Sequence, residues 1–106
     1  MDDRERRLAQ NSAHYREVNE RTRIVDRAAA NVDLVCECAD RACTKMIHIS
    51  ADDYEAVRND GARFIVVRGH EMHDGEKIVA RKNGFNVVEK TGASKAYTEA
   101  RDPRVR

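Results

Sequence analysis

The chain has 106 residues, of which 41% are hydrophobic and 37% charged, and its formal net charge is +1. This length allows one domain with one modest core, and the lack of tryptophan makes that core mainly aliphatic. The near-neutral charge argues against strong nonspecific nucleic-acid binding, and no apolar run approaches the roughly 18 residues of a membrane-spanning helix. The charged first residues do not read as a secretory signal. We therefore expect a cytoplasmic protein with reduced cysteines.

The first predicted element is one long amphipathic helix. It covers about residues 4–31, which contain no proline or glycine, and its apolar positions recur at spacings of seven, three and four residues. Because a helix of this length exceeds the width of the remaining roughly 75 residues, one expectation is that part of it projects and pairs with another protein or with a second copy of the chain. The alternative is that the helix packs across the sheet. The stripe consists of Leu8, Tyr15, Val18, Thr22, Val25, Ala29 and Val32.

Two short strands are predicted next, at residues 33–37 and 44–49. Leu34, Cys36 and Cys38 alternate along the chain, so on a strand their side chains point to one face. Residues 39–42 are polar and read as a turn. We therefore predict a hairpin that carries the cysteines at its tip.

A second helix is predicted to begin after Ser50 and to end near residue 59. Ser50 is a good N-cap, and Asp53 stands three residues later, as in an aspartate variant of the capping box. Residues 64–67 are apolar at every position, which is typical of a strand buried on both faces.

A last hairpin is predicted around Asn83-Gly84, because this dipeptide suits a two-residue turn with positive φ at both positions. Its strands are residues 78–80 and 85–88, with Ala80 facing Val87 and Val79 facing Val88. After residue 90 the apolar periodicity is lost.

These elements predict an α+β fold, with a long N-terminal helix followed by a mainly antiparallel sheet in the order β-β-α-β-β-β and a metal knot at the cysteines. The chain divides into the helix (residues 1–32), a zinc-binding α+β domain (33–90) and a polar, flexible tail (91–106).

The three cysteines of the chain, Cys36, Cys38 and Cys43, form a C-x-C-x4-C motif within eight residues. Two cysteines two apart on a strand present both sulfurs to one side, and the short turn brings the third beside them. Zn²⁺ prefers four thiolate or imidazole ligands, so we predict a zinc site that takes its fourth ligand from elsewhere. The alternatives are three reduced, partly buried core cysteines, or an iron–sulfur site, which usually needs four cysteines.

Four histidines compete for the fourth position. His70 is favoured because it follows a buried strand and Gly69, whose backbone freedom helps to aim the ring. His73, in the same loop, and His48, whose parity on its strand opposes Cys43, remain alternatives, and His14 on the long helix is the weakest candidate.

An open zinc site with a water ligand would be Lewis acidic, and Glu37 or Glu71 could then transfer protons. The chain lacks the H-x-E…P-C-x-x-C signature of zinc deaminases and is short for a catalytic pocket. We therefore favour a structural site and no enzymatic role, and we expect Glu37 on the solvent face and Glu71 exposed in a loop.

The C-E-C-x4-C-T motif of residues 36–44 and the G-H-E motif of residues 69–71 resemble those of a family of small uncharacterised bacterial proteins, common in actinobacteria. Further similar stretches are residues 16–21, 50–58, 63–66 and 87–90, so the resemblance covers most of the chain. It implies that Cys36, Cys38, Cys43 and His70 act as one set, and it implies no activity or partner.

Three functional hypotheses follow from these features. The first is a zinc-binding protein-interaction or regulatory module that engages a partner or itself through the long helix. The second is a zinc-stabilised nucleic-acid-binding protein, with possible contacts from Lys77, Arg81, Lys82 and Lys90. The third is a thiol- or metal-responsive sensor, because clustered thiolates are oxidisable when partly exposed.

Overall fold

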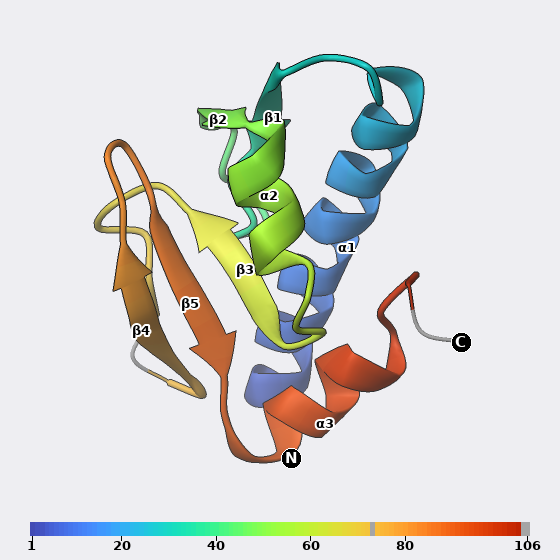
Figure 1. Ribbon diagram of the computed structural model, residues 1–106. Helices are drawn as coiled ribbons and strands as arrows, with labels where there is room; N and C mark the ends of the chain where they lie inside the picture. Colours follow the sequence, from blue (N-terminus) through green and yellow to red (C-terminus); the bar gives the residue numbers. More distant parts are fainter. Residues whose placement is uncertain (73, 105–106) are drawn as a thin grey trace.

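The computed structural model describes residues 1–72 and 74–104 and confirms the α+β class, with a long N-terminal helix followed by antiparallel strands (Figure 1). The elements, in chain order, are α1 (Asp3–Val25), β1 (Asn31–Val35), β2 (Met46–Ser50), α2 (Ala51–Val57), β3 (Arg63–Val66), β4 (Glu76–Arg81), β5 (Asn86–Lys90) and α3 (Gly92–Ala100).

Strands β1 and β2 form the predicted antiparallel hairpin, with Leu34 opposite Ile47. Both side chains are buried, while alternate positions on each strand are exposed, as expected for a sheet with one covered face. Helix α2 follows β2 directly. Its N-cap is Ser50, whose hydroxyl accepts a hydrogen bond from the Asp53 N–H at 3.1 Å, which confirms the predicted helix start.

The other three strands form an antiparallel sheet in the order β3-β5-β4. Ala80 lies opposite Val87, as predicted, but Val88 faces Ile78, because a register shift between residues 78 and 80 leaves Val79 without a partner in the ladder. The turn also differs from the prediction. Gly84 has φ +88°, whereas no described non-glycine residue has positive φ, so the two-residue turn type expected for Asn83-Gly84 does not form.

The apolar core lies between the hairpin, α2 and the three-stranded sheet, and helix α1 contributes none of the described residues of this cluster. Two of the cysteines belong to it. Its buried members are Val32, Leu34, Cys36, Cys38, Ile47, Ile49, Tyr54, Val57, Phe64, Ile65, Val66, Phe85, Val87 and Val88.

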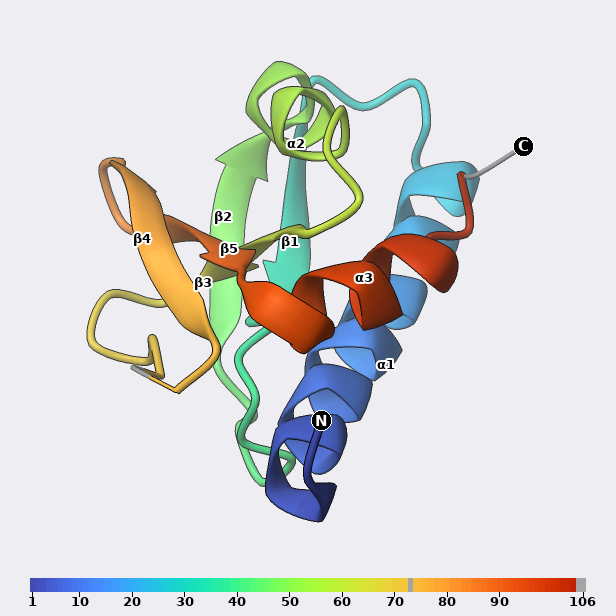
Figure 2. The same ribbon diagram turned by 90° about the horizontal axis from the view of Figure 1, so that it is seen from below.

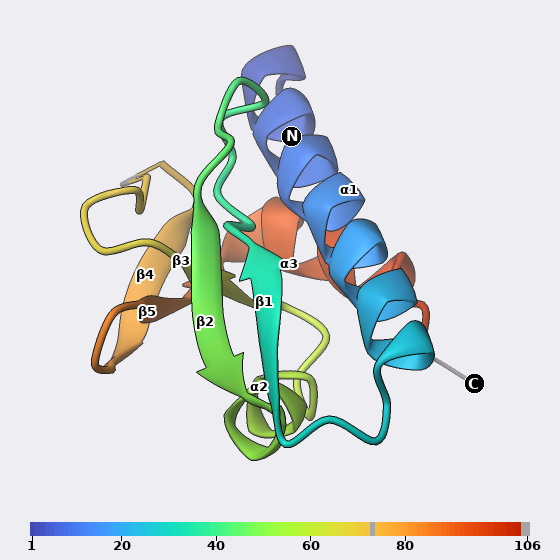
Figure 3. The same ribbon diagram turned by 90° about the horizontal axis from the view of Figure 1, so that it is seen from above.

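Helix α1 packs along the side of the hairpin, and the stripe predicted for it is wrong (Figure 3). Its buried positions are Ala9, Ser12, Arg16, Asn19 and Glu20, most of them polar. The helix also ends at residue 25 rather than 31, and its last residue, Val25, is 82% exposed. The face that docks is therefore selected by hydrogen bonds and not by an apolar pattern.

Helix α3 is an element that the sequence did not predict, since the segment was expected to be a polar tail. It lies against α1 (Figure 2). Arg16 contributes to this contact, because its guanidinium donates to the Thr98 carbonyl at 2.8 Å. It also donates, outside α3, to the Gly61 carbonyl at 2.6 Å. The same guanidinium lies 4.6 Å from the centre of the Phe64 ring, a cation–π distance.

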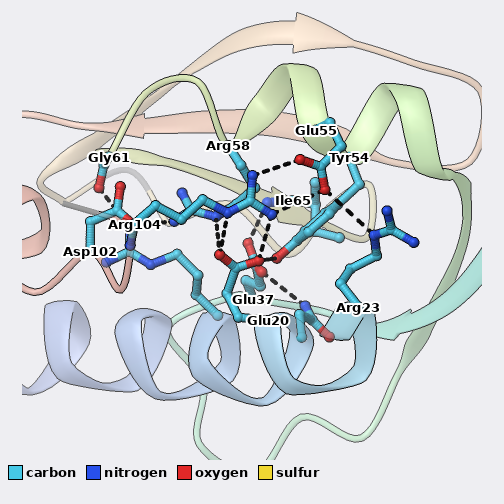
Figure 4. Close-up of polar contacts among 12 residues, drawn as sticks. Glu20, Arg23, Glu37, Tyr54, Glu55, Arg58, Gly61, Ile65, Asp102 and Arg104 are labelled. Carbon is cyan, nitrogen blue, oxygen red and sulfur yellow. Dashed lines mark hydrogen bonds and ion pairs between the residues drawn. The ribbon is translucent and has the colours of Figure 1, made fainter. Parts of the chain in front are cut away.

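The segment after α3 is also anchored. Arg104 donates to both carboxylates of an acidic pair, Glu20 on α1 and Glu55 on α2, at 2.5–3.0 Å (Figure 4). Arg58 forms an ion pair with Asp102 and lies 3.3 Å from Glu20. These buried and half-buried charges join α1, α2 and residues 102–104.

Among the described residues, no helix has the length and apolar character needed to cross a membrane.

Candidate metal centre

The structure brings together the four residues proposed from the sequence as metal ligands. The sulfur atoms of Cys36, Cys38 and Cys43 and a ring nitrogen of His70 all lie within 4.8 Å of one another. Cys36 and Cys38 are buried, whereas Cys43 and His70 are partly exposed. These side chains come from the hairpin tip and from the loop after β3, so the tertiary fold, and not the local motif alone, completes the set.

The spacing of these atoms suits a tetrahedral ion. The Nδ1 atom of His70 lies 3.5 Å from the sulfur of Cys43 and 3.8 Å from that of Cys36. With zinc bond lengths of about 2.3 Å to sulfur and about 2.0–2.1 Å to nitrogen, the nitrogen–sulfur edge of a regular tetrahedron is about 3.6 Å. The four side chains therefore could hold a metal ion such as zinc.

The first cysteine is held by backbone hydrogen bonds on two sides. The Cys36 N–H donates to the Lys45 carbonyl at 2.9 Å, which extends the β1–β2 pairing past the end of the ladder. On the other side, the Val67 N–H donates to the Cys36 sulfur at 3.2 Å. An N–H directed at a thiolate partly offsets its charge, which matters where three thiolates share one divalent ion.

The turn between Cys38 and Cys43 is organised by Asp40. Its carboxylate accepts from the Ala42 N–H at 2.9 Å, and its carbonyl accepts from the Cys43 N–H at 3.0 Å. This local turn reverses the chain so that Cys43 returns beside the first two sulfurs.

His70 is aimed by the loop that follows β3. Gly69 has φ +90°, a conformation that glycine adopts without strain, and the His70 N–H donates to the Val67 carbonyl at 2.9 Å. Glu71 supports the same turn, because its carboxylate accepts from the Gly69 N–H at 3.0 Å. A small cavity of about 230 Å³ beside the cluster is lined in part by Cys38 and His70.

Glu37 does not lie on the solvent face, as the sequence suggested, but is fully buried. Its carboxylate accepts from the Ile65 N–H at 2.9 Å and from the Asn19 side-chain amide at 2.8 Å, and its own N–H donates to the Ile65 carbonyl at 2.8 Å. Burial raises the pKa of Glu37 to about 7, against the opposing effect of these hydrogen bonds. Glu37 thus ties the middle of the C-x-C motif to strand β3.

Helix α1 also holds the cysteine segment, residues 36–43, through polar side chains that sequence reasoning missed. Asn19 donates to the Val35 carbonyl at 2.9 Å and accepts from the Val35 N–H at 2.8 Å. One and two turns earlier, Tyr15 and Asn11 donate to carbonyl groups of the turn between the cysteines. The available signal was the four-residue spacing of Asn11, Tyr15 and Asn19, of which only Tyr15 was counted in the predicted apolar stripe.

The three thiols influence one another strongly. The pKa of Cys36 is raised, first because its thiol donates a hydrogen bond to Cys38 and then because it is buried. The same hydrogen bond lowers the pKa of Cys38. The pKa of Cys43 is raised, chiefly by burial. Proximity therefore favours one thiolate in the cluster, and a bound cation would favour deprotonation of the others.

The competing histidines lie elsewhere or outside the described part of the chain. His48 is exposed on the hairpin, where its Nδ1 lies 2.7 Å from an Asp33 carboxylate oxygen, and it does not belong to the cluster. His14 is exposed on α1, with its ring beside that of Tyr15. His73 lies outside the described residues.

The four residues proposed for nucleic-acid contacts do not form one free basic surface. Lys90 is buried and donates to Glu76 at 2.6 Å, so its ammonium group is not available to a phosphate. Lys77 lies 4.0 Å from Glu89. Arg81 and Lys82 are exposed near the β4–β5 turn.

No protein-family model, curated protein or solved structure matches this chain.

Proposed function

We propose that Cys36, Cys38, Cys43 and His70 bind one Zn²⁺ ion as a closed structural site. The observation that carries this proposal is the clustering of four zinc-type donors from two separate segments, with two nitrogen–sulfur distances close to the edge of a zinc tetrahedron. Three thiolates and one imidazole fill the four positions that zinc takes in structural sites, which leaves none for a water or substrate.

The protein that carries this site is, in our proposal, a non-enzymatic interaction or regulatory module. A closed site supports this reading over metal-assisted hydrolysis, which needs an open coordination position. The partner is another protein or a second copy of the chain. The exposed end of α1 is where we place the contact, because Ile24 and Val25 leave 69% and 82% of their surface accessible there.

A second candidate, a thiol- or metal-responsive sensor, rests on the partial exposure of Cys43 and His70. Oxidants reach exposed sulfur more readily than buried sulfur, and oxidation of one thiolate would remove a zinc ligand. If peroxide neither ejects zinc nor alters the number of subunits, this candidate is excluded.

Native mass spectrometry tests the zinc proposal directly. We expect one zinc ion per chain, lost on treatment with a strong chelator and regained when zinc is added. His70→Ala should retain three sulfur ligands but bind zinc more weakly. His48→Ala is the matched control, since His48 is exposed and lies outside the cluster, and it should bind zinc like the parent.

Two results would contradict the proposal. A parent protein that takes up no zinc would remove the site altogether. Equal zinc affinity in His70→Ala and the parent would show that the fourth ligand is wrong. The same spectra count subunits, and a monomer at all concentrations would exclude self-association through α1.

A further inference from the structure

The docking of helix α1 depends on polar contacts to an unusual degree. None of the described α1 residues belongs to the main apolar cluster, although the helix packs beside β1 of the hairpin (Figure 3). Asn11, Tyr15 and Asn19 are spaced four residues apart, so their side chains share one face of the helix. All three form hydrogen bonds to the segment that runs from Val35 to Cys43. Helix α1 is therefore attached to the chain segment that carries the three cysteines.

Two of these contacts reach the turn enclosed by the metal ligands. The Asn11 amide donates to the Ala39 carbonyl at 2.8 Å. The Tyr15 hydroxyl lies 2.6 Å from the Arg41 carbonyl oxygen and 3.3 Å from that of Cys43. These carbonyl groups belong to residues 39–43, which follow one proposed ligand, Cys38, and end at another, Cys43. The positions of these carbonyl groups therefore depend on the conformation of this short turn.

The exposed part of this turn has few other hydrogen bonds among the described residues. Ala39 is buried, but residues 40–42 are exposed, and the turn's internal hydrogen bonds all involve Asp40. An ion bound to Cys38 and Cys43 would close this loop and restrict its conformations, as a crosslink does. When the loop is ordered, Asn11 and Tyr15 find their acceptors already in place.

We propose that zinc binding is linked to the docking of the first half of α1, with Asn11 and Tyr15 as positioning residues for the metal site. This inference rests on the zinc site proposed above. Linkage is reciprocal: if zinc orders the turn against α1, then α1 held against the turn strengthens zinc binding by the same factor. Neither residue is a metal ligand, so an effect on zinc affinity must pass through the turn.

The second half of α1 should respond less. Asn19 bonds to Val35 and to Glu37, which Ile65 on β3 also holds, so neither contact depends on the turn between Cys38 and Cys43. Glu20 bonds to Tyr54 and Arg104, both remote from the metal ligands in the chain. We therefore expect zinc loss to release α1 locally, from its N-terminal end to about Tyr15, while the β3-β5-β4 sheet stays folded.

Two full-length variants test the reciprocal effect. Asn11→Ala and Tyr15→Phe each remove hydrogen bonds to the turn, and the dissociation constant for zinc, measured by competition with a chromophoric chelator, should rise about three- to tenfold in each. Their matched controls are Gln10→Ala, an exposed amide on the same helix, and Tyr97→Phe, whose hydroxyl has no hydrogen-bond partner among the described residues. Both controls should bind zinc like the parent.

Hydrogen exchange on the unmodified protein gives an independent readout that needs no variant to fold. Removal of zinc should speed exchange of the amides in residues 6–15 at least tenfold, with a much smaller change in β3 and β5. Restoring zinc should restore protection.

The outcomes separate this inference from the zinc proposal. If the parent binds no zinc, the proposed site fails and the linkage fails with it. If the parent binds zinc but both variants bind it as tightly as their controls, the site stands and the linkage is overturned. Exchange in residues 6–15 that does not respond to zinc would overturn it equally.

Discussion

Arg104→Ala should destabilise the protein although the residue is remote from the metal ligands. In the parent, three nitrogen atoms of the Arg104 guanidinium donate to Glu20 and Glu55 (Figure 4). The two carboxylates are unequally buried, with exposed fractions of 10% for the Glu20 side chain and 43% for that of Glu55. The substitution therefore removes one partly buried ion pair and one exposed pair.

The expected loss follows from this difference in burial. A hydrogen bond to a charged group contributes about 1.5–3 kcal/mol, whereas an exposed ion pair contributes about 0–1 kcal/mol. Glu20 keeps Tyr54 and Arg58 as partners, so it is not left alone in the variant. We expect a loss of about 2 kcal/mol, which for a domain of this size lowers the melting temperature by about 10 °C.

The assay is thermal unfolding followed by circular dichroism, with zinc at the same concentration throughout. Arg104→Lys should fall between the parent and the alanine variant, because an ammonium group cannot pair with both carboxylates through a planar fork. Arg101→Ala is the matched control. Arg101 is exposed and stacks on the Tyr97 ring at 3.6 Å, so its loss should lower the melting temperature by less than half as much.

Acid should abolish the difference between Arg104→Ala and the parent. Burial raises the pKa of Glu20, but hydrogen bonds from Arg104 and Tyr54 outweigh it and the net shift is downward from 4.5. The pKa of Glu55 is lowered, chiefly by its hydrogen bonds with Arg104. Carboxyl groups with lowered pKa stabilise the fold above their unfolded pKa and lose this effect as the pH falls through the folded value. The difference in melting temperature between the parent and Arg104→Ala should thus be largest at pH 7 and decrease below about pH 4.5.

Two results would refute this reasoning. A melting temperature for Arg104→Ala equal to that of Arg101→Ala would mean that the acidic pair does not anchor residues 102–104 in solution. If the difference in melting temperature between the parent and Arg104→Ala is unchanged at pH 3.5, the ionised carboxylates are not its source.

Three further substitutions probe the metal centre. Cys38→Ser should abolish tight zinc binding and lower the melting temperature, because an ion that binds only the folded protein stabilises it; a zinc-loaded, equally stable variant would contradict this. Glu37→Gln replaces one carboxylate oxygen, which accepts from the Ile65 N–H or the Asn19 amide, with an amide donor. The free energy of unfolding, measured with urea, should fall by about 1–3 kcal/mol. An unchanged urea midpoint would argue that these two hydrogen bonds do not stabilise the fold. Gly69→Ala meets no atom within 4 Å but must adopt φ +90°, so we expect weaker zinc binding at a cost of about 1–2 kcal/mol, and parent-like affinity would show that this turn does not aim His70.

The elements that the sequence predicted correctly are those with local signals. Ser50 and Asp53 mark the start of α2 by side-chain chemistry that operates within one turn, and the hairpin that carries the cysteines follows from alternation around Leu34. The grouping of the three sulfurs with His70 was predictable as well. A site with three cysteines needs one more ligand, and histidine is one of the few residue types that zinc prefers.

The predictions that failed concern long-range polar contacts. The buried face of α1 was predicted from apolar spacing, but Arg16 and Asn19 on that face donate hydrogen bonds to carbonyl groups far away in the chain. Glu37 was expected in solvent because an isolated carboxylate is costly to bury, and its partners on β3 and α1 are not visible locally. Helix α3 has only weak local signals and is stabilised by its contacts with α1.

The Asn19 side chain also affects the unpaired edge of strand β1, where a strand from another copy of the chain could pair. Strand β1 pairs with β2 on one side only, so the other side of the strand carries backbone groups without a ladder partner. At Val35 the Asn19 amide bonds to both of these groups, the N–H and the C=O, in the manner of a neighbouring strand. An edge satisfied in this way offers no template there to an incoming strand. The helix that lies beside the cysteine segment thus also covers the outer edge of β1 at Val35.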